Sequence, residues 1–275
     1  MTSIIAIANQ KGGVGKTTTA INLGASLAAT GLRVLLIDSD SQGNASTGLG
    51  VDPFARRRTS YDVLVGEASL AGSVLRTAVP NLDLVPGDEN LVGLEAQLNS
   101  DPRKNFRLDM ALKAFLADAA EGRAISEDGR PLGYDVILID CPPSLSTITI
   151  NAMAACDSVI VPVQCEFLAL EGLSQIMRTV DLVRDACNPR LEIKGVVLTM
   201  HDKRNSLSDQ VSAEVRGFFG AKVYQTVIPR NVRLSEAPSF GKPAILYDSK
   251  CAGSEAYIRL AQEMLDRDRE KRNAA

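Results

Sequence analysis

Near its N-terminus this chain carries the segment Lys11-Gly12-Gly13-Val14-Gly15-Lys16-Thr17-Thr18. Residues 4–8 before it form an apolar run typical of a strand buried on both faces, and residues 17–30 after it have helical spacing. Glycines between a strand and a helix let successive backbone N–H groups point at phosphate oxygens, and the helix N-terminus adds the positive end of its dipole. The segment therefore predicts a phosphate-binding loop.

Two side chains of this loop suit nucleotide chemistry. The Lys16 ammonium can lie against the β- and γ-phosphates, and the Thr17 hydroxyl can ligate Mg²⁺. The loop departs from the common G-x-x-x-x-G-K-[S/T] pattern, because Gln10 replaces the first glycine and Lys11 is an additional lysine. Thr18 stands where a dinucleotide-binding loop has its third glycine, which argues against an NAD enzyme.

Strand-like and helical patterns alternate along the rest of the chain. This alternation predicts an α/β fold, in which a mostly parallel central sheet has helices on both faces. Because no linker is long enough to divide the chain, we expect one domain over residues 1–275, with a charged tail from about residue 266. Strand-like runs lie at residues 34–37, 82–85, 136–139, 159–161, 196–198 and 223–228, and helical patterns at 103–120, 168–186, 206–219 and 251–266.

The composition excludes several classes of protein. The chain has a single histidine, His201, so a Ser-His-Asp triad or a multi-histidine metal site would depend on that residue alone. No two of the five cysteines form a C-x-x-C pair, which argues against structural zinc and a disulfide framework. No apolar run approaches the roughly 20 residues of a membrane helix, and the N-terminus lacks the features of a signal peptide. We therefore expect a cytoplasmic protein.

The charge is unevenly distributed. The net charge is −3, yet residues 178–242 hold 11 Lys and Arg against 7 Asp and Glu. Charge alone favours a mildly basic solvated surface there, while a basic face for a polyanion stays open. The triple Arg56-Arg57-Arg58 is interpreted as a solvated loop.

Several segments, in the same order, resemble the ParA/MinD family of ATPases and within it the ParA (Soj) chromosome-partitioning ATPases. The loop from Lys11 to Thr18 is similar to the deviant Walker A motif of that family. One departure is Ser41, where the family usually has proline, and we expect it to alter loop stiffness more than chemistry. The likeness runs from Ile4 to about Leu265 and includes residues 38–46 (DSDSQGNAS), 139–144 (IDCPPS), 162–166 (PVQCE), 169–173 (ALEGL) and 227–238 (VIPRNVRLSEAP).

Acidic residues at two predicted strand ends complement the loop. Asp38 and Asp40 follow the run at 34–37, and Asp140 follows the run at 136–139, at the edge where open α/β sheets bind ligands. The resemblance implies that Asp40 positions the hydrolytic water and that Asp140 holds Mg²⁺ through water. For Asp38, a role in the site and a role in capping the following turn both stay open.

The resemblance also implies how ATP is bound. Lys11 would reach across a two-fold interface to phosphates bound by the other subunit, so that ATP favours a homodimer. The absence of an [NT]-K-x-D motif favours ATP over GTP. The expected catalytic residues are Lys11, Lys16 and Asp40; the expected Mg²⁺ ligands are Thr17, Asp40 and Asp140; and the expected nucleotide-binding residues are Lys11, Gly12, Gly13, Val14, Gly15, Lys16, Thr17, Thr18, Met200, Pro229 and Asn231.

Double-stranded DNA is the expected partner of the ATP-bound dimer. The resemblance places non-specific contacts at Arg204 and Arg233, with Lys242 as a neighbour, and no base-reading helix accompanies them. A ParB-type centromere-binding protein would stimulate hydrolysis and release the dimer, so that ATP turnover drives chromosome or plasmid segregation. The resemblance therefore implies a nucleoid-associated protein.

Three other functions compete with this one. A MinD-like membrane-associated ATPase is disfavoured, because residues 266–275 have no apolar stripe. A metal-cluster ATPase would need cysteines that bridge a dimer, and Cys156 and Cys165 are not spaced like a chelating pair. A ParA-like ATPase that positions a protein assembly stays open, because no motif identifies the partner surface.

Overall fold

The computed structural model describes residues 2–167 and 169–274, and most of its strands pair in parallel. The strands are β1 (Ser3–Ile7), β2 (Val34–Asp38), β3 (Leu75–Arg76), β4 (Leu82–Val85), β5 (Val136–Asp140), β6 (Ser158–Gln164), β7 (Glu192–His201) and β8 (Val223–Pro229). They form one sheet in the order β3-β4-β2-β5-β1-β6-β7-β8. Every neighbouring pair is parallel except β3 with β4, so the predicted α/β fold is confirmed.

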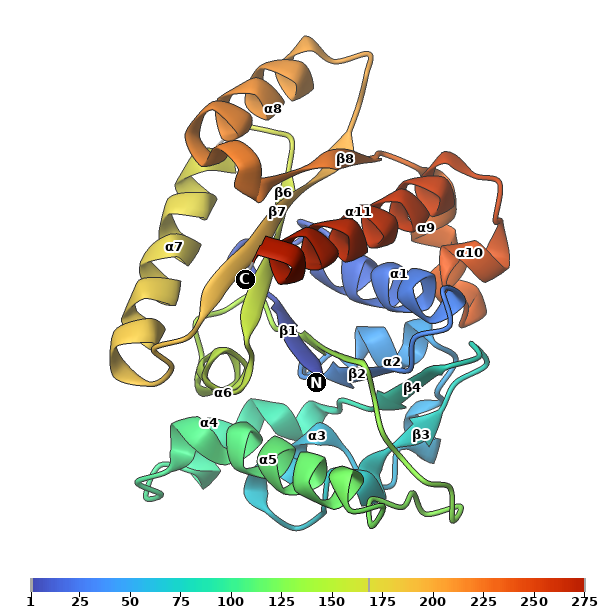
Figure 1. Cartoon of the computed structure of the whole chain (residues 1–275), viewed down its shortest axis with the longest axis vertical. Helices are drawn as coiled ribbons and strands as arrows, with labels where there is room; N and C mark the ends of the chain where they lie inside the picture. The colour runs from blue at the N-terminus through green and yellow to red at the C-terminus, as the bar shows by residue number, and fades with distance from the viewer. Residues whose placement is uncertain (1, 168, 275) are drawn as a thin grey trace.

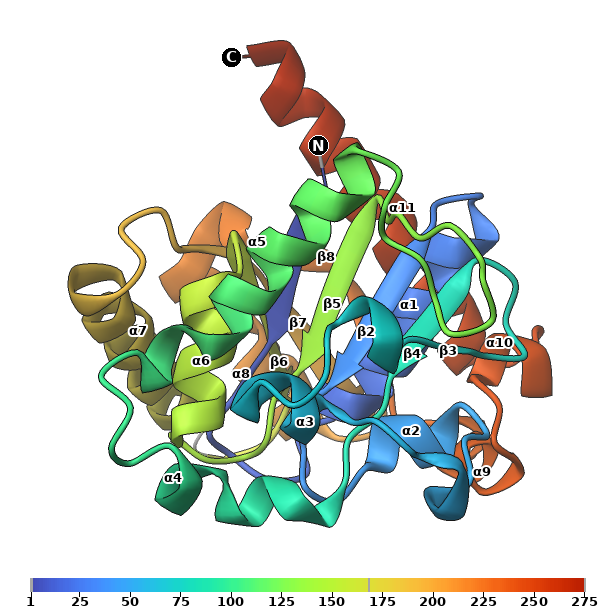
Figure 2. The same cartoon turned by 90° about the horizontal axis from the view of Figure 1, so that it is seen from below.

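Helices cover both faces of this sheet (Figures 1 and 2). They are α1 (Lys16–Ala29), α2 (Asn44–Gly48), α3 (Ser60–Val65), α4 (Leu94–Gln97), α5 (Arg107–Ala120), α6 (Thr147–Ala155), α7 (Ala169–Ala186), α8 (Ser206–Phe219), α9 (Val232–Glu236), α10 (Ala244–Tyr247) and α11 (Ala252–Ala274). Buried side chains of α3 to α8 join one core cluster, and those of α1, α2 and α9 to α11 join the other. Among the described residues no helix has the length and apolar character needed to span a bilayer.

Elements without a long apolar pattern were not predicted. Strand β3 has two residues at the sheet edge, which is too short to show a periodicity. The short helices α2, α3 and α4 and the nine-residue helix α6 were also missed. In α6 nearly every residue is buried, so it lacks the alternation of buried and exposed faces by which helices are recognised.

Two predicted helix boundaries are wrong. The pattern at 103–120 begins as a 3-10 turn at Lys104–Phe106, and the regular helix starts at Arg107. The final helix does not end near residue 266, because α11 continues to Ala274. The first residue of the predicted helix at 168–186 lies outside the described residues.

Specific contacts hold the charged end of α11 against β7 and β8. The Arg267 guanidinium donates hydrogen bonds to the backbone oxygens of Ala221 and Val223, both at 2.9 Å, and lies 4.4 Å from the ring centroid of Tyr224. The Lys194 ammonium pairs with Asp268 at 2.5 Å. The predicted charged tail is therefore helical as far as Ala274; Arg267 and Asp268 anchor its start beside the sheet, and residues 269–274 are exposed.

A contact between two glycines joins α2 to the segment after α9. Gly50 follows α2, and Gly241 follows the 3-10 turn η6 (Ala237–Phe240). Both have positive φ angles, 80° at Gly50 and 62° at Gly241. A Cβ on Gly241 would lie 2.7 Å from the Cα of Gly50, and backbone cannot swing aside as a side chain can. Both positions therefore require glycine.

We expect Gly241→Ala to lower the free energy of unfolding by about 1–3 kcal/mol, because the new methyl group meets backbone and the φ angle disfavours alanine. Urea denaturation followed by circular dichroism measures this change. Gly93→Ala is the matched control, since its Cβ would meet nothing within 4 Å. Equal denaturation midpoints for both variants would contradict the expected close contact.

Candidate functional site

The loop between β1 and α1 presents backbone N–H groups and one buried ammonium. Gly13 and Gly15 have φ angles of 73° and 88°, and Gly15 caps α1 without any side-chain hydrogen bond. Lys16 is 6% exposed, and its Nζ donates to the backbone oxygen of Lys11 at 3.1 Å. Burial lowers the pKa of Lys16, while the nearby Asp140 opposes this shift. The arrangement is that of an anion site at a helix N-terminus.

Two buried carboxylates lie beside this loop. Asp38 ends β2 and Asp140 ends β5, and the two are register partners with no exposed surface. Burial raises the pKa of both, and the charge of Asp38 raises that of Asp140 further. The Thr17 hydroxyl is near enough to lower the pKa of Asp140, but neither carboxylate oxygen has a hydrogen bond of normal geometry among the described residues. Buried unpaired carboxylate oxygens suit the hydration shell of a hard cation such as Mg²⁺.

Asp38 is instead fully bonded within the protein. Its Oδ2 accepts hydrogen bonds from the backbone N–H and the hydroxyl of Ser46, at 2.8 and 2.6 Å, and its Oδ1 accepts one from the backbone N–H of Asp40 at 3.2 Å. The Ser46 hydroxyl in turn accepts from the Gly87 N–H at 3.0 Å. Asp38 therefore fixes the loop that carries Asp40, which favours the capping interpretation left open by the sequence.

Two adjoining hollows bring together most of the predicted nucleotide-binding residues. The first, of about 490 Å³, is lined by the loop and by Lys16, Thr17 and Asp40. The second, of about 260 Å³, is lined by Met200, Pro229 and Asn231. Both hollows include Gly15, Thr18 and Met200, so a single ligand can occupy the two together. Met200 has a positive φ of 52°, a strained conformation of the kind that gathers at functional sites.

The remaining predicted loop residues differ in their surroundings. Val14 is buried, and its carbonyl oxygen accepts a hydrogen bond from the Thr199 hydroxyl at 2.8 Å. Gly12 is exposed with open space around it in this chain. Lys11 points to Glu166, which follows β6, and its Nζ donates to Glu166 Oε1 at 2.7 Å. The two side chains are 37% and 42% exposed, so this ion pair lies at the surface.

Sequence reasoning missed several residues of the site. Glu166 ends the segment 162–166, but nothing in that segment points to Lys11. Tyr257 lines the second hollow from α11 and meets the Thr19 hydroxyl at 3.1 Å. Ser46 accepts a hydrogen bond from the Gly87 N–H, 41 residues away, and Thr199 donates one to the Val14 oxygen, 185 residues away, which no local pattern signals.

The predicted basic residues lie in the segments that follow β7 and β8. Arg204 precedes α8, Arg233 lies on α9 and Lys242 follows η6, and all three are exposed. A hydrogen bond from the Arg230 N–H to the His201 oxygen, at 3.0 Å, ties the two segments together.

Acidic neighbours pair with two of these arginines. The Arg204 guanidinium binds Asp202 through Nε and Nη2, at 3.0 and 2.9 Å. Arg233 pairs with Glu236 at 2.7 Å and with Asp248 at 3.5 Å. A phosphate would have to displace these carboxylates, but exposed ion pairs of this kind contribute little and yield readily.

The interpretation of residues 56–58 as a solvated loop is wrong for Arg56. Its guanidinium donates to the backbone oxygens of Gly87 and Val51, at 2.9 and 3.1 Å, and to the Thr47 hydroxyl at 2.8 Å. Arg56 therefore clamps the segment after α2 instead of facing solvent.

Comparison with known proteins matches this geometry to one family. A family model described as an AAA domain matches residues 2–193. The chromosome partitioning protein ParA of Caulobacter vibrioides is 58% identical over 272 residues, which cover 99% of this chain and 97% of that protein. The sporulation initiation inhibitor protein Soj of Bacillus subtilis is 52% identical over 264 residues, covering 96% of this chain and 98% of that protein.

A solved structure supports the same assignment of the fold. It is described as cobyrinic acid a,c-diamide synthase from Mycobacterium smegmatis with bound ATP analog and magnesium. It superposes with a TM-score of 0.82 at 35% identity, covering 96% of this chain and 94% of that one.

We expect Asp140→Asn to raise the free energy of unfolding of the ligand-free protein by about 1–2 kcal/mol at pH 7, because it removes a buried charge whose desolvation outweighs its attraction to Thr17 and Lys16. Since burial raises the pKa of Asp140, its ionisation costs stability increasingly as the pH rises above the ordinary value of 3.8. The gain should therefore shrink as the pH falls. Urea denaturation in EDTA, repeated from pH 5 to 8, measures it.

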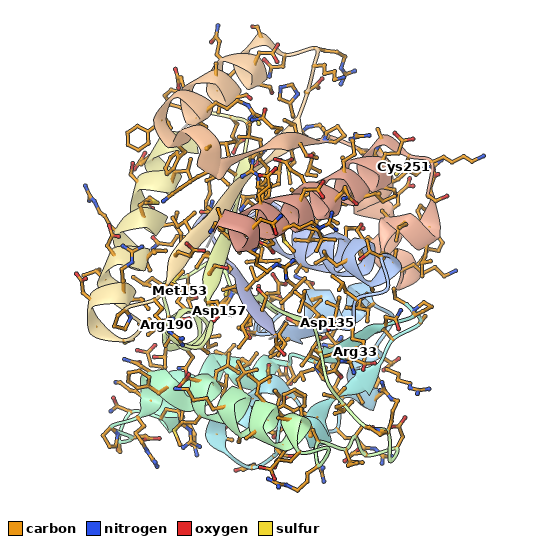
Figure 3. The ribbon with its side chains drawn as sticks, in the orientation of Figure 1. Arg33, Asp135, Met153, Asp157, Arg190 and Cys251 are labelled. Atoms are coloured by element: carbon orange, nitrogen blue, oxygen red, sulfur yellow. The ribbon has the colours of Figure 1, made fainter. Side chains whose placement is uncertain are left out.

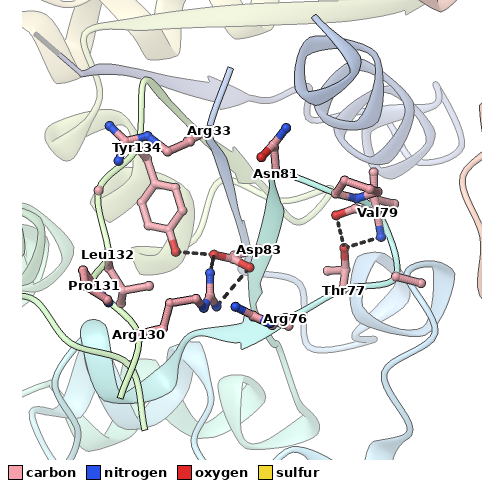
Figure 4. Close-up of a pocket in the computed structure, with 13 residues that line it drawn as sticks. Arg33, Arg76, Thr77, Val79, Asn81, Asp83, Arg130, Pro131, Leu132 and Tyr134 are labelled. Atoms are coloured by element: carbon pink, nitrogen blue, oxygen red, sulfur yellow. Dashed lines mark hydrogen bonds and ion pairs between the residues drawn. The ribbon is translucent and has the colours of Figure 1, made fainter. Parts of the chain in front are cut away.

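Asp83→Asn is the matched control for a buried carboxylate that has partners. Asp83 accepts hydrogen bonds from the Arg130 guanidinium, at 2.8 and 3.3 Å, and from the Tyr134 hydroxyl at 2.8 Å (Figure 4). This variant should lose stability. If Asp140→Asn were destabilised as much as the control, Asp140 would have partners that the described residues do not show.

Proposed function

The chain belongs to the ParA (Soj) family of chromosome-partitioning proteins, and we propose that it is a Mg²⁺-dependent ATPase that dimerises around ATP and binds duplex DNA as that dimer. One observation carries this proposal. Lys16, Thr17 and Asp40 line a hollow that continues toward Met200, and the buried Asp140 carboxylate lies beside these three residues. We propose that residues 1–275 form a single domain with this activity.

In this proposal the residues of the two hollows bind different parts of ATP. Backbone N–H groups of the loop and the Lys16 ammonium would bind the phosphates, and the second hollow would hold the base. The Thr17 hydroxyl and, through water, Asp140 would hold Mg²⁺, which neutralises charge on the phosphates. Asp40 is 8% exposed at the edge of the first hollow, where its carboxylate would orient the attacking water.

Lys11 supplies the proposed link between ATP and the dimer. Its ammonium is at the surface and pairs with Glu166 within the same chain. In the dimer it would leave Glu166 and contact phosphates bound by the other subunit. ATP carries more negative charge than ADP, so this exchange favours the dimer only while the γ-phosphate is present.

The segments after β7 and β8 form the proposed DNA face. Arg204, Arg233 and Lys242 would contact phosphates without reading sequence. A ParB-type protein bound at a centromere-like site would stimulate hydrolysis and release the dimer, which converts ATP turnover into movement of DNA along the nucleoid. The exposed end of α11, residues 269–274, has no apolar stripe, which disfavours a MinD-like membrane anchor.

We expect tight binding to a short duplex of random sequence with ATP and Mg²⁺, and weak binding with ADP or without nucleotide. Fluorescence anisotropy at stepped salt concentrations measures the affinity. The logarithm of the binding constant should fall linearly with the logarithm of the salt concentration, with a slope of about −0.9 for each phosphate contact.

Two charge reversals test where this binding takes place. Arg233→Glu should remove DNA binding while ATP-dependent dimerisation persists. Arg190→Glu is the matched control, because Arg190 precedes β7 at the opposite end of the sheet (Figure 3). Equal loss in both variants would mean that the DNA face is elsewhere. If the wild-type chain bound no DNA in any nucleotide state, DNA would not be its partner, and an ATPase that positions a protein assembly would be favoured.

We expect Glu166→Gln to strengthen ATP-dependent dimerisation by about two- to fivefold, since it removes an exposed ion pair that holds Lys11 within its own chain. Analytical ultracentrifugation with ATP measures the dimer dissociation constant. Glu171→Gln, at an exposed position on α7, is the control and should leave that constant unchanged. A weaker dimer in Glu166→Gln would show that Glu166 itself contributes to the dimer contact.

A further inference from the structure

The segment that follows β8 exposes large apolar side chains among cations. Helices α9 and α10 and the turn η6 pack against one another. Phe240 on η6 is 62% exposed and Leu246 on α10 is 46% exposed, and Val232 on α9, which also lines the second hollow, is 70% exposed. The cations of the same segment are Arg230, Arg233, Lys242 and Lys250, against the acids Glu236 and Asp248. A lone exposed apolar residue needs no explanation, but a cluster of them within a basic surface indicates a contact.

Phe240 makes a specific aromatic contact in this cluster. Its ring stacks on Tyr247 with the centroids 4.9 Å apart and the planes 26° apart. The Tyr247 hydroxyl donates to Glu236 at 3.3 Å, and the Arg233 guanidinium lies 6.0 Å from the Tyr247 centroid. Gly241, the next residue, is fixed by its backbone contact with Gly50. Little conformational entropy is therefore lost when a partner covers the Phe240 ring.

The chemistry of this surface fits duplex DNA. Arg233 and Lys242 offer charge to the phosphates, and Phe240 lies between them in the sequence with an apolar face. The DNA grooves expose apolar deoxyribose and base edges next to the phosphates, and proteins that bind without sequence preference insert apolar side chains there. If the chain recognised its partner by charge alone, the exposed phenyl ring of Phe240 would add nothing to the affinity.

Resting on the proposed DNA binding, we propose that Phe240 contacts duplex DNA directly. Its ring packs in the groove against sugar and base edges, while Arg233 and Lys242 neutralise the flanking phosphates. Phe240 thus supplies a non-ionic part of the affinity, which the release of counterions does not provide. This part persists at high salt, where the contribution of the basic residues has faded.

Salt dependence separates the two contributions in one experiment. The full chain with ATP and Mg²⁺ is titrated against labelled duplex at stepped salt. Phe240→Ala should weaken binding by about tenfold at every salt concentration and leave the slope unchanged. Arg233→Gln should instead make the slope less negative by about 0.9 for each phosphate that is no longer neutralised. Phe218→Ala, which removes a ring that is 74% exposed on α8, is the matched control and should bind like the wild type.

A conservative variant and two checks on Phe240→Ala separate loss of the DNA contact from loss of the folded dimer. Phe240→Tyr retains the ring and should bind like the wild type, and Phe240→Ala should keep the dimer mass and the basal ATP turnover of the wild type. Wild-type affinity for Phe240→Ala at all salts overturns the inference alone, as does a change confined to its slope. If the wild-type chain binds no duplex in any nucleotide state, the proposed function fails and this inference fails with it.

Discussion

Burial of two carboxylates on adjacent parallel strands is the constraint around which this protein is organised. Asp38 and Asp140 share one register, have no exposed surface and have pKa values raised by that burial. Hydrogen bonds within the described part of the chain satisfy the Asp38 carboxylate but not the Asp140 carboxylate. Asp38 is bonded to Ser46 and Asp40, which shapes the loop after β2. Asp140 has no such bonds among the described residues, so some stability is sacrificed at the position where a cation can restore it.

The second hollow, which we propose holds the base, and the proposed DNA face share the short helix α9. Asn231 and Leu234 line the hollow, and Asn231 also caps α9 by accepting a hydrogen bond from the Arg233 N–H at 3.0 Å. Arg233, between them in the sequence, is exposed and pairs with Glu236. A ligand that orders Asn231 thereby orders the first turn of the helix that carries Arg233. In the proposed mechanism, this helix would link nucleotide state to DNA contact locally, in addition to the link through dimerisation.

The sequence predicted most clearly those features that depend on neighbouring residues. The phosphate-binding loop and the strands at 34–37 and 136–139 could be identified because their patterns are local, and parallel pairing then places Asp40 and Asp140 near the loop. The resemblance supplied Met200, Pro229 and Asn231, which the structure gathers in one hollow. The partners of side chains could not be predicted. Glu166 meets Lys11 across 155 positions, and Arg267 holds the end of α11 by bonds to carbonyl oxygens 44 and 46 residues away.

The contact between Gly50 and Gly241 has a mechanical consequence. Gly50 follows α2, which begins a few residues after Asp40, and Gly241 follows Phe240. Two backbones that touch without intervening side chains cannot absorb relative motion by changing rotamers. A displacement of α2 toward η6 must therefore push the turn that presents the Phe240 ring. The contact is therefore a rigid connection between the segment after Asp40 and the surface that we propose binds DNA.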